Sequence, residues 1–177
     1  MHSYGGQVGS SALAGLVPTG TETDGVLHLI YMCAFALPKT MSLFDQTKES
    51  GLEDAMSAAF DVGEDGRVAM RDPKGVLFGE EGSQVKGVDG YLETLVERWN
   101  GSAMVERGDG EAWREVGMGV TYVVTTEDRM VAVERQRAMV EGMRREGVEV
   151  DVVEVKTGHC PNLTAVEEIV EVVMRAV

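Results

Sequence analysis

The residue that most directly suggests chemistry is Ser3, in the opening segment His-Ser-Tyr-Gly-Gly at residues 2–6. A serine followed by small residues is typical of a nucleophile elbow, a tight turn between a strand and a helix that exposes the hydroxyl at the top of a parallel sheet. The full signature is Gly-x-Ser-x-Gly, and Met1 stands here in place of the first glycine. We therefore interpret Ser3 as a candidate nucleophile without a strand ahead of it, and the alternative is a plain N-cap of the following helix.

Two residues much later in the chain could complete a site with Ser3. Asp128 lies in Thr-Thr-Glu-Asp-Arg, directly after an apolar run, and His159 lies in Lys-Thr-Gly-His-Cys-Pro, after another. A serine hydroxyl is a poor nucleophile until an imidazole takes its proton, and the imidazole needs a carboxylate on its other nitrogen. Because both runs are expected to be parallel strands, their carboxyl ends meet at one edge of the sheet. The pattern predicts a triad of Ser3, Asp128 and His159.

Each of these residues also has a structural interpretation. Asp128 alone could cap a helix over residues 130–146, and His159 alone could be an ordinary loop histidine before Pro161. Glu127 is the rival acid, but adjacent side chains point in different directions and we favour Asp128. The occurrence of all three types in order, each after the expected element, favours the triad over the separate interpretations.

The elements that must position these residues follow an α/β pattern. Apolar runs rich in β-branched residues predict strands, and helical spacing of apolar residues predicts the helices between them, so we expect right-handed βαβ units and a parallel sheet. Gln136 is the polar exception on the apolar face of one helix. The expected elements are a helix over 4–16, a strand over 26–36, a strand over 119–126, a helix over 130–146, a strand over 148–155 and a helix from the Thr164–Glu167 capping box to about Ala176.

Residues 42–117 break this regular pattern. Short apolar groups alternate with glycines and charged residues, which indicates an insertion rather than a further βα repeat. We expect helices over 52–60 and 90–99, and a loop or small β excursion over 61–82 with a turn at Asp65-Gly66. Trp99 and Trp113 are predicted to be packing residues of the insertion, and the alternative is that one of them lines a substrate pocket. A polar loop is expected over 18–25.

Composition narrows the class of protein. The chain has 177 residues and a net charge of −14, from 30 acidic and 16 basic residues, which argues against nucleic acid or an anionic membrane as a partner. The two cysteines, Cys33 and Cys160, form neither a disulfide framework nor a metal-ligand spacing, and we expect buried, reduced thiols. The longest apolar stretch is too short to span a bilayer, and no secretory signal is recognisable. These features predict a soluble cytoplasmic protein.

The quoted motifs, together with His-Leu-Ile-Tyr-Met-Cys-Ala-Phe-Ala-Leu-Pro and Gly-His-Cys-Pro-Asn-Leu, resemble the α/β-hydrolase superfamily, in its esterase and hydroxynitrile-lyase-like branch. The resemblance implies Ser3 as nucleophile, Asp128 as acid and His159 as base, with the backbone N–H of Tyr4 as one oxyanion-hole donor. It also implies that residues 42–117 form a helical cap over the pocket. The expected activity is that of a serine hydrolase on a small-molecule ester or related acyl substrate, without cofactor or metal; lyase chemistry on the same triad and a tailoring role in small-metabolite biosynthesis are variants.

The resemblance covers about the C-terminal two-thirds of such a domain. We therefore expect one partial α/β-hydrolase domain over 1–177, with elbow helix and strand at 1–41, cap at 42–117, and the acid- and base-bearing strands and helices at 118–177. The strand before the elbow and the loop with the second oxyanion donor are expected to be absent. The alternative is thus a truncated, weakly active or inactive paralogue that needs a partner, or an incomplete gene model. An unpaired edge of the 26–36 strand would allow homo-oligomers.

Overall fold

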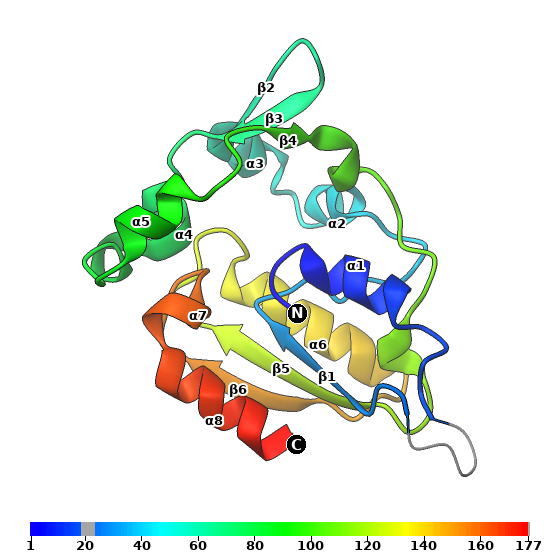
Figure 1. Cartoon of the computed structure of the whole chain (residues 1–177). Helices are drawn as coiled ribbons and strands as arrows, with labels where there is room; N and C mark the ends of the chain where they lie inside the picture. Colours follow the sequence, from blue (N-terminus) through cyan, green and yellow to red (C-terminus); the bar gives the residue numbers. More distant parts are fainter. Residues whose placement is uncertain (19–23, 177) are drawn as a thin grey trace.

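A three-stranded parallel sheet lies at the centre of the fold in the computed structural model, which describes residues 1–18 and 24–176 (Figure 1). The strand order is β1-β5-β6, and both pairings are parallel. The strands are β1 (His28–Met32), β5 (Gly119–Thr125) and β6 (Asp151–Val155). The predicted α/β class with a parallel sheet is therefore confirmed, and most of the loop predicted over 18–25 lies outside the described residues.

Helices cover both faces of this sheet. They are α1 (Gly5–Ala12), α6 (Val133–Arg145), the single turn α7 (Pro161–Thr164) and α8 (Val166–Ala176). Successive residues of β5 point to opposite faces, as the pleat of a strand requires. Tyr122 belongs to the apolar cluster that contains Met139 of α6, whereas Val123 belongs to the cluster that contains Ile169 of α8. The sheet is thus buried between two layers of helices.

Several predicted elements are shorter than the sequence suggested. The strand expected over 26–36 ends at Met32, because Cys33 has a φ of 38° and the chain turns there into a buried loop. The helix expected over 4–16 ends at Ala12, and Gly15 follows with a φ of 81°. The strand predicted over 119–126 and the helix over 130–146 are confirmed to within a few residues.

Most of the segment between β1 and β5 lies above the carboxyl ends of the strands, and its last part, with residues 112–114, runs down beside α1 (Figure 1). We call its residues 42–117 the cap. Its helices are α2 (Leu43–Glu49), α3 (Glu53–Ala59), α4 (Pro73–Gly82) and α5 (Val88–Glu93), with the 3-10 turns η1 (Gly101–Met104) and η2 (Ala112–Arg114). A small antiparallel sheet joins β2 (Phe60–Val62), β3 (Arg67–Met70) and β4 (Trp99–Asn100).

The cap contains more β structure than its pattern indicated. The helix over 52–60 is confirmed, as is a β excursion with its turn at Asp65-Gly66, where Gly66 has a φ of 74° as such a turn requires. The expectation that this loop or β excursion continues to residue 82 is wrong, because Pro73–Gly82 form α4. The helix expected over 90–99 is wrong in its second half. It ends at Glu93, because Trp99 pairs with Val68 in the cap sheet instead.

On its outer side β1 is paired only by the first residues of the chain. The Met1 ammonium donates to the Ile30 carbonyl at 2.6 Å, and the Met32 N–H donates to the Met1 carbonyl at 2.8 Å. No further strand lies on this side among the described residues. Self-association through this edge stays a prediction. Across residues 1–18 and 24–176, no helix combines the length and apolar character needed to cross a bilayer.

Candidate active site

Ser3 lies in a strained turn between the chain's first residues and α1. Its φ is 52°, a region that residues other than glycine rarely adopt. The Ser3 carbonyl accepts hydrogen bonds from the N–H groups of Phe35 and Gly6, both at 3.0 Å. A side chain at Gly6 would place its Cβ 2.6 Å from the Phe35 carbonyl oxygen, so only glycine fits this close approach. The N-cap of α1 is Tyr4 without a side-chain cap, so the interpretation of Ser3 as a plain N-cap is wrong.

A chain of hydrogen bonds joins the three residues that the sequence singled out. The Nε2 atom of His159 lies 2.8 Å from Ser3 Oγ, and its Nδ1 atom lies 2.8 Å from Asp128 Oδ2. A carboxylate only accepts hydrogen bonds, so Nδ1 donates to Asp128 and Nε2 is left to accept from the serine hydroxyl. The side chain of His159 is buried, as is that of Asp128. The structure thus brings Ser3, His159 and Asp128 together, and their catalytic roles stay a proposal.

Asp128 is held by both of its oxygens. Oδ1 accepts the N–H groups of Met130 and Val131, each at 2.8 Å, while Oδ2 accepts the Thr125 hydroxyl at 2.9 Å besides His159. The residue therefore closes the turn before α6, although the N-cap position itself is Ala132. The interpretation of Asp128 as the cap of this helix is therefore wrong, and its role as the acid of a triad stays a proposal.

The rival acid lies elsewhere. Glu127 is exposed, and its carboxylate is 3.4 Å from the ammonium of Lys156. No hydrogen bond joins it to His159 or Ser3 in the part of the chain that the structure describes. Of the two adjacent acids, only Asp128 contacts the imidazole.

Gln136 is a supporting residue to which the sequence analysis gave no role. It is fully buried, and its amide nitrogen donates to the Val131 carbonyl at 2.7 Å and to the Thr125 carbonyl at 3.1 Å. Its amide oxygen accepts the Thr125 N–H at 2.9 Å. These bonds fix both ends of the loop that carries Asp128. The signal was present in the sequence, because a polar residue on an otherwise apolar helical face needs buried partners.

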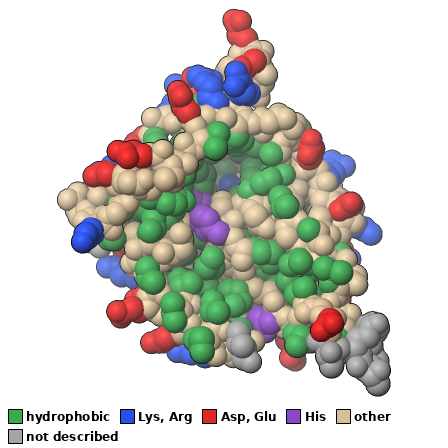
Figure 2. Space-filling view, in the orientation of Figure 1, with side chains coloured by type: hydrophobic (Ala, Val, Ile, Leu, Met, Phe, Trp, Pro, Cys, Tyr) green, Lys and Arg blue, Asp and Glu red, His purple; other side chains and the backbone are tan. Residues whose placement is uncertain are grey.

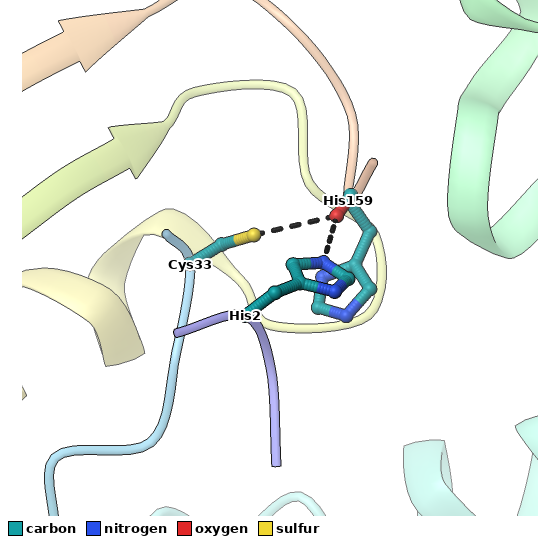
Figure 3. Close-up of side chains that lie close together, drawn as sticks. All are labelled: His2, Cys33 and His159. Atoms are coloured by element: carbon teal, nitrogen blue, oxygen red, sulfur yellow. Dashed lines mark hydrogen bonds between the residues drawn. The ribbon is translucent and has the colours of Figure 1, made fainter. Parts of the chain in front are cut away.

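The backbone of His159 is held by two side chains (Figure 3). His2 Nε2 lies 2.6 Å from the His159 carbonyl oxygen, and the Cys33 thiol donates to the same oxygen at 3.3 Å. Burial lowers the pKa of His2 to about 4, so its ring is neutral near neutral pH and Nε2–H is the donor. His2 therefore helps to position His159.

His2, Cys33 and His159 are also residue types that bind metals, and their ligand atoms lie within 4.8 Å of one another. Both ring nitrogens of His159, however, already bond Ser3 and Asp128. Burial also raises the pKa of the Cys33 thiol far above its ordinary value, whereas a metal binds the thiolate. The donor set does not fit a metal, and its hydrogen bonds account for the three residues.

The backbone N–H of Tyr4 has no acceptor among the described residues, although the neighbouring N–H groups do. Tyr4 lines the same cavity as Ser3. A free N–H directly after a nucleophilic serine is the donor that a developing oxyanion requires. This placement supports the predicted role of Tyr4, which stays a proposal.

A cavity of about 970 Å³ separates the cap from the carboxyl ends of the strands, and Ser3 and His159 line it. Figure 2 shows the hollow with hydrophobic side chains around it and histidine at its rim. Its volume is at the upper end of the range for small-molecule sites. The apolar side chains that the cap contributes include Leu52, Met56, Phe60, Leu92, Trp99 and Met104.

The two tryptophans of the cap have different surroundings. Trp99 lines the cavity and packs edge-on against Phe60, with ring centroids 5.7 Å apart. Trp113 is buried in the main apolar cluster beside the sheet. The prediction that both pack within the insertion is therefore wrong for Trp113, because η2 lies against α1 and the core rather than over the cavity.

Comparison with known proteins supports the family and the fold. A sequence profile described as the alpha/beta hydrolase family matches residues 1–172. A pyrethroid hydrolase from Sphingobium faniae JZ-2 superposes with a TM-score of 0.69 at 16% identity, covering 98% of this chain and 67% of that one. Polyneuridine aldehyde esterase superposes with a TM-score of 0.69 at 18% identity, covering 98% and 69%. No curated protein sequence matches the chain significantly.

Proposed function

The chain belongs to the alpha/beta hydrolase family, and on that basis we propose that it is a serine hydrolase that cleaves a small-molecule ester through Ser3, His159 and Asp128. The observation that carries the proposal is the unbroken chain of 2.8 Å hydrogen bonds from Asp128 through His159 to Ser3, which lines a cavity with mainly apolar walls. The fold alone would not support it, because one fold hosts many functions.

Each proposed role follows from the geometry. His159 Nε2 takes the proton of Ser3 as Oγ attacks the ester carbonyl, and Asp128 stabilises the imidazolium that forms. The Tyr4 N–H donates to the oxyanion of the tetrahedral intermediate. The protonated imidazole then gives its proton to the leaving alkoxide, which leaves an acyl-enzyme on Ser3. A water molecule, deprotonated by His159, hydrolyses that acyl group and restores the serine.

The cavity supports an ester with a substantial apolar part. Its lining is mainly aliphatic and aromatic, so binding is favoured by the burial of apolar surface. The fold neighbours include a pyrethroid hydrolase and an esterase, whose names fit the same class of reaction. Cleavage of an acyl bond by the triad needs no cofactor.

We expect turnover to be slow. The Tyr4 N–H supplies one oxyanion donor, whereas acyl-transfer sites ordinarily use two, and the loop with the second donor is expected from the sequence to be absent. A missing donor lowers the rate by about 10²- to 10³-fold. Slow turnover would be consistent with the alternative of a weakly active protein that works fully only with a partner.

Labelling with a fluorophosphonate probe tests the proposal directly, because the probe reacts covalently with an activated serine and needs no known substrate. We expect the purified protein to be labelled, and expect Ser3→Ala and His159→Ala to abolish labelling. Ser57→Ala is the matched control, since Ser57 is exposed on α3 and away from the cavity lining. A folded protein that is not labelled, or labelling that survives in Ser3→Ala, would overturn the proposal.

A further inference from the structure

Arg135 is a cation without an acidic partner on the wall of the cavity. It lies in α6 and lines the same cavity as Ser3. No carboxylate among the described residues lies within ion-pairing distance of its guanidinium. Its Nη2 atom instead donates to two neutral groups of α2, the Gln46 amide oxygen at 2.8 Å and the Thr47 hydroxyl at 3.2 Å. The positive charge is therefore not balanced locally.

The surroundings of Arg135 make this imbalance costly. Its Nε atom is enclosed and has no hydrogen-bond partner, and its guanidinium carbon lies 5.5 Å from the centroid of the Phe35 ring. Burial lowers the pKa of Arg135, although a guanidinium stays protonated at neutral pH. A partly buried charge without a counter-ion opposes folding. Gln46 and Thr47 could be satisfied by a neutral side chain, so they do not explain why a cation stands here.

The charge lies close to the proposed reaction centre. Phe35 contacts both residues, because its ring faces the Arg135 guanidinium and its N–H donates to the Ser3 carbonyl. Figure 2 shows a basic side chain within the hollow, surrounded by hydrophobic ones. The other cation of the lining, Arg129, is exposed. The lining also contains one carboxylate, that of Glu97, which is exposed, so Arg135 is the one partly buried charged side chain that the described lining offers to an anion.

We propose that Arg135 binds a carboxylate of the substrate, so that the preferred substrates are esters whose apolar chain also carries one carboxylate. The inference rests on the proposed function. A guanidinium matches the planar carboxylate in shape and charge, and the two N–H groups on Nη1, which unlike Nε is not enclosed, have no acceptor among the described residues. A single enclosed cation matches a single negative charge, which favours a carboxylate over a phosphate dianion.

Matched esters test this specificity. The mono-4-nitrophenyl esters of hexanedioic, octanedioic and decanedioic acid carry a terminal carboxylate, and the 4-nitrophenyl esters of hexanoic, octanoic and decanoic acid are their neutral counterparts. We expect wild type to prefer at least one acidic ester over its neutral counterpart. In Arg135→Met we expect kcat/KM for that acidic ester to fall by about 10- to 100-fold, the contribution of a hydrogen-bonded ion pair, with the neutral ester almost unchanged.

Two further variants separate charge from structure. Arg135→Lys keeps the charge and should retain part of the preference. Arg137→Met removes the same charge from the exposed side of α6, outside the cavity, and should leave the preference unchanged. Equal losses on acidic and neutral esters in a folded Arg135→Met protein, or no preference in wild type, would overturn the inference while the Ser3-dependent hydrolysis of neutral esters still stood.

Binding without turnover keeps the two proposals distinguishable. Calorimetric titration of the Ser3→Ala protein with octanoate and with octanol requires no catalysis. If octanoate binds more tightly than octanol, and the Arg135→Met change removes this difference, the carboxylate site is supported even if no ester is hydrolysed. Equal binding of octanoate before and after the Arg135→Met change would refute it.

Discussion

Replacement of Asp128 by Asn is the most informative perturbation of the proposed site. The Asp128 carboxylate accepts four hydrogen bonds of 2.9 Å or shorter, two at each oxygen. An asparagine has one accepting oxygen, so its NH₂ group must face one of these donor pairs. Keeping the oxygen towards the N–H groups of Met130 and Val131 preserves the turn, and the NH₂ group then faces His159.

This arrangement changes the tautomer of His159. Nδ1 would have to accept from the asparagine, so the ring proton would move to Nε2, the atom 2.8 Å from Ser3 Oγ. A protonated Nε2 donates to the serine and cannot act as its base. We therefore expect kcat for Asp128→Asn to fall by about 10⁴-fold with the turn intact, which corresponds to about 5 kcal/mol of transition-state stabilisation.

The assay is hydrolysis of a 4-nitrophenyl ester together with the rate of fluorophosphonate labelling, and a thermal melt verifies folding. Glu127→Gln is the control, because it removes the adjacent, exposed carboxylate that bonds neither Ser3 nor His159. We expect this control to act like wild type. The reasoning is refuted if a folded Asp128→Asn protein keeps its activity within about tenfold, far above the 10⁴-fold loss expected from a wrong tautomer, or if Glu127→Gln loses as much.

The remaining predictions concern stability. Gly6→Ala should destabilise the folded protein by about 1–3 kcal/mol, because the new Cβ would lie 2.6 Å from the Phe35 carbonyl oxygen. Gly5→Ala is the control, because a Cβ there meets nothing within 4 Å, and it should be neutral or stabilising. Urea unfolding measures both changes. Burial lowers the pKa of His2 from 6.5 to about 4. The neutral ring should therefore contribute at most about 3 kcal/mol to the free energy of unfolding, and this contribution is fully present above pH 6.5 and is lost as the pH falls towards 4. His2→Gln, which can still donate to the His159 carbonyl, should lose less stability than wild type between about pH 7 and pH 5; equal losses would exclude His2 as the source.

The sequence predicted the elements that depend on local pattern and missed those that depend on tertiary contacts. The run over 119–126 is a strand because β-branched residues suit a central, doubly covered position, and it is β5. The run over 26–36 has the same composition, yet only His28–Met32 is strand. The positive φ of Cys33 and the passage of Phe35 beneath Ser3 end it, and no periodicity contains that information.

The candidate site follows the same division. Asp128 and His159 could be singled out because each follows a recognisable strand, and the carboxyl ends of parallel strands converge. Ser3 could be singled out because small residues of a nucleophile-elbow pattern follow it. Gln136 and Arg135 could not be assigned roles, since their partners Thr125, Val131, Gln46 and Thr47 come together only in the folded chain. A polar residue on an apolar face indicates that a partner exists without indicating which one.

The strained turn at Ser3 is held by hydrogen bonds to its backbone. A positive φ at a non-glycine residue costs about 1–2 kcal/mol, and a net hydrogen bond returns about 0.5–1.5 kcal/mol. Three such hydrogen bonds involve the backbone of Ser3. Its N–H donates to the Met32 carbonyl, and its carbonyl accepts from the N–H groups of Phe35 and Gly6. Met32 is the last residue of β1 and Phe35 lies three residues after it, so the end of β1 stabilises the turn.

This stabilisation links the elbow to the cavity wall. The Phe35 residue that holds the Ser3 carbonyl also carries the ring beneath Arg135, and Gly6 allows α1 to approach Phe35 closely enough for both contacts. A change at Gly6 should therefore displace Ser3 and Phe35 together. Gly6→Ala is expected to slow fluorophosphonate labelling even in protein that remains folded, whereas Gly5→Ala, on the same turn of α1, should not. Equal labelling rates in the two variants would show that Ser3 is held independently of Phe35.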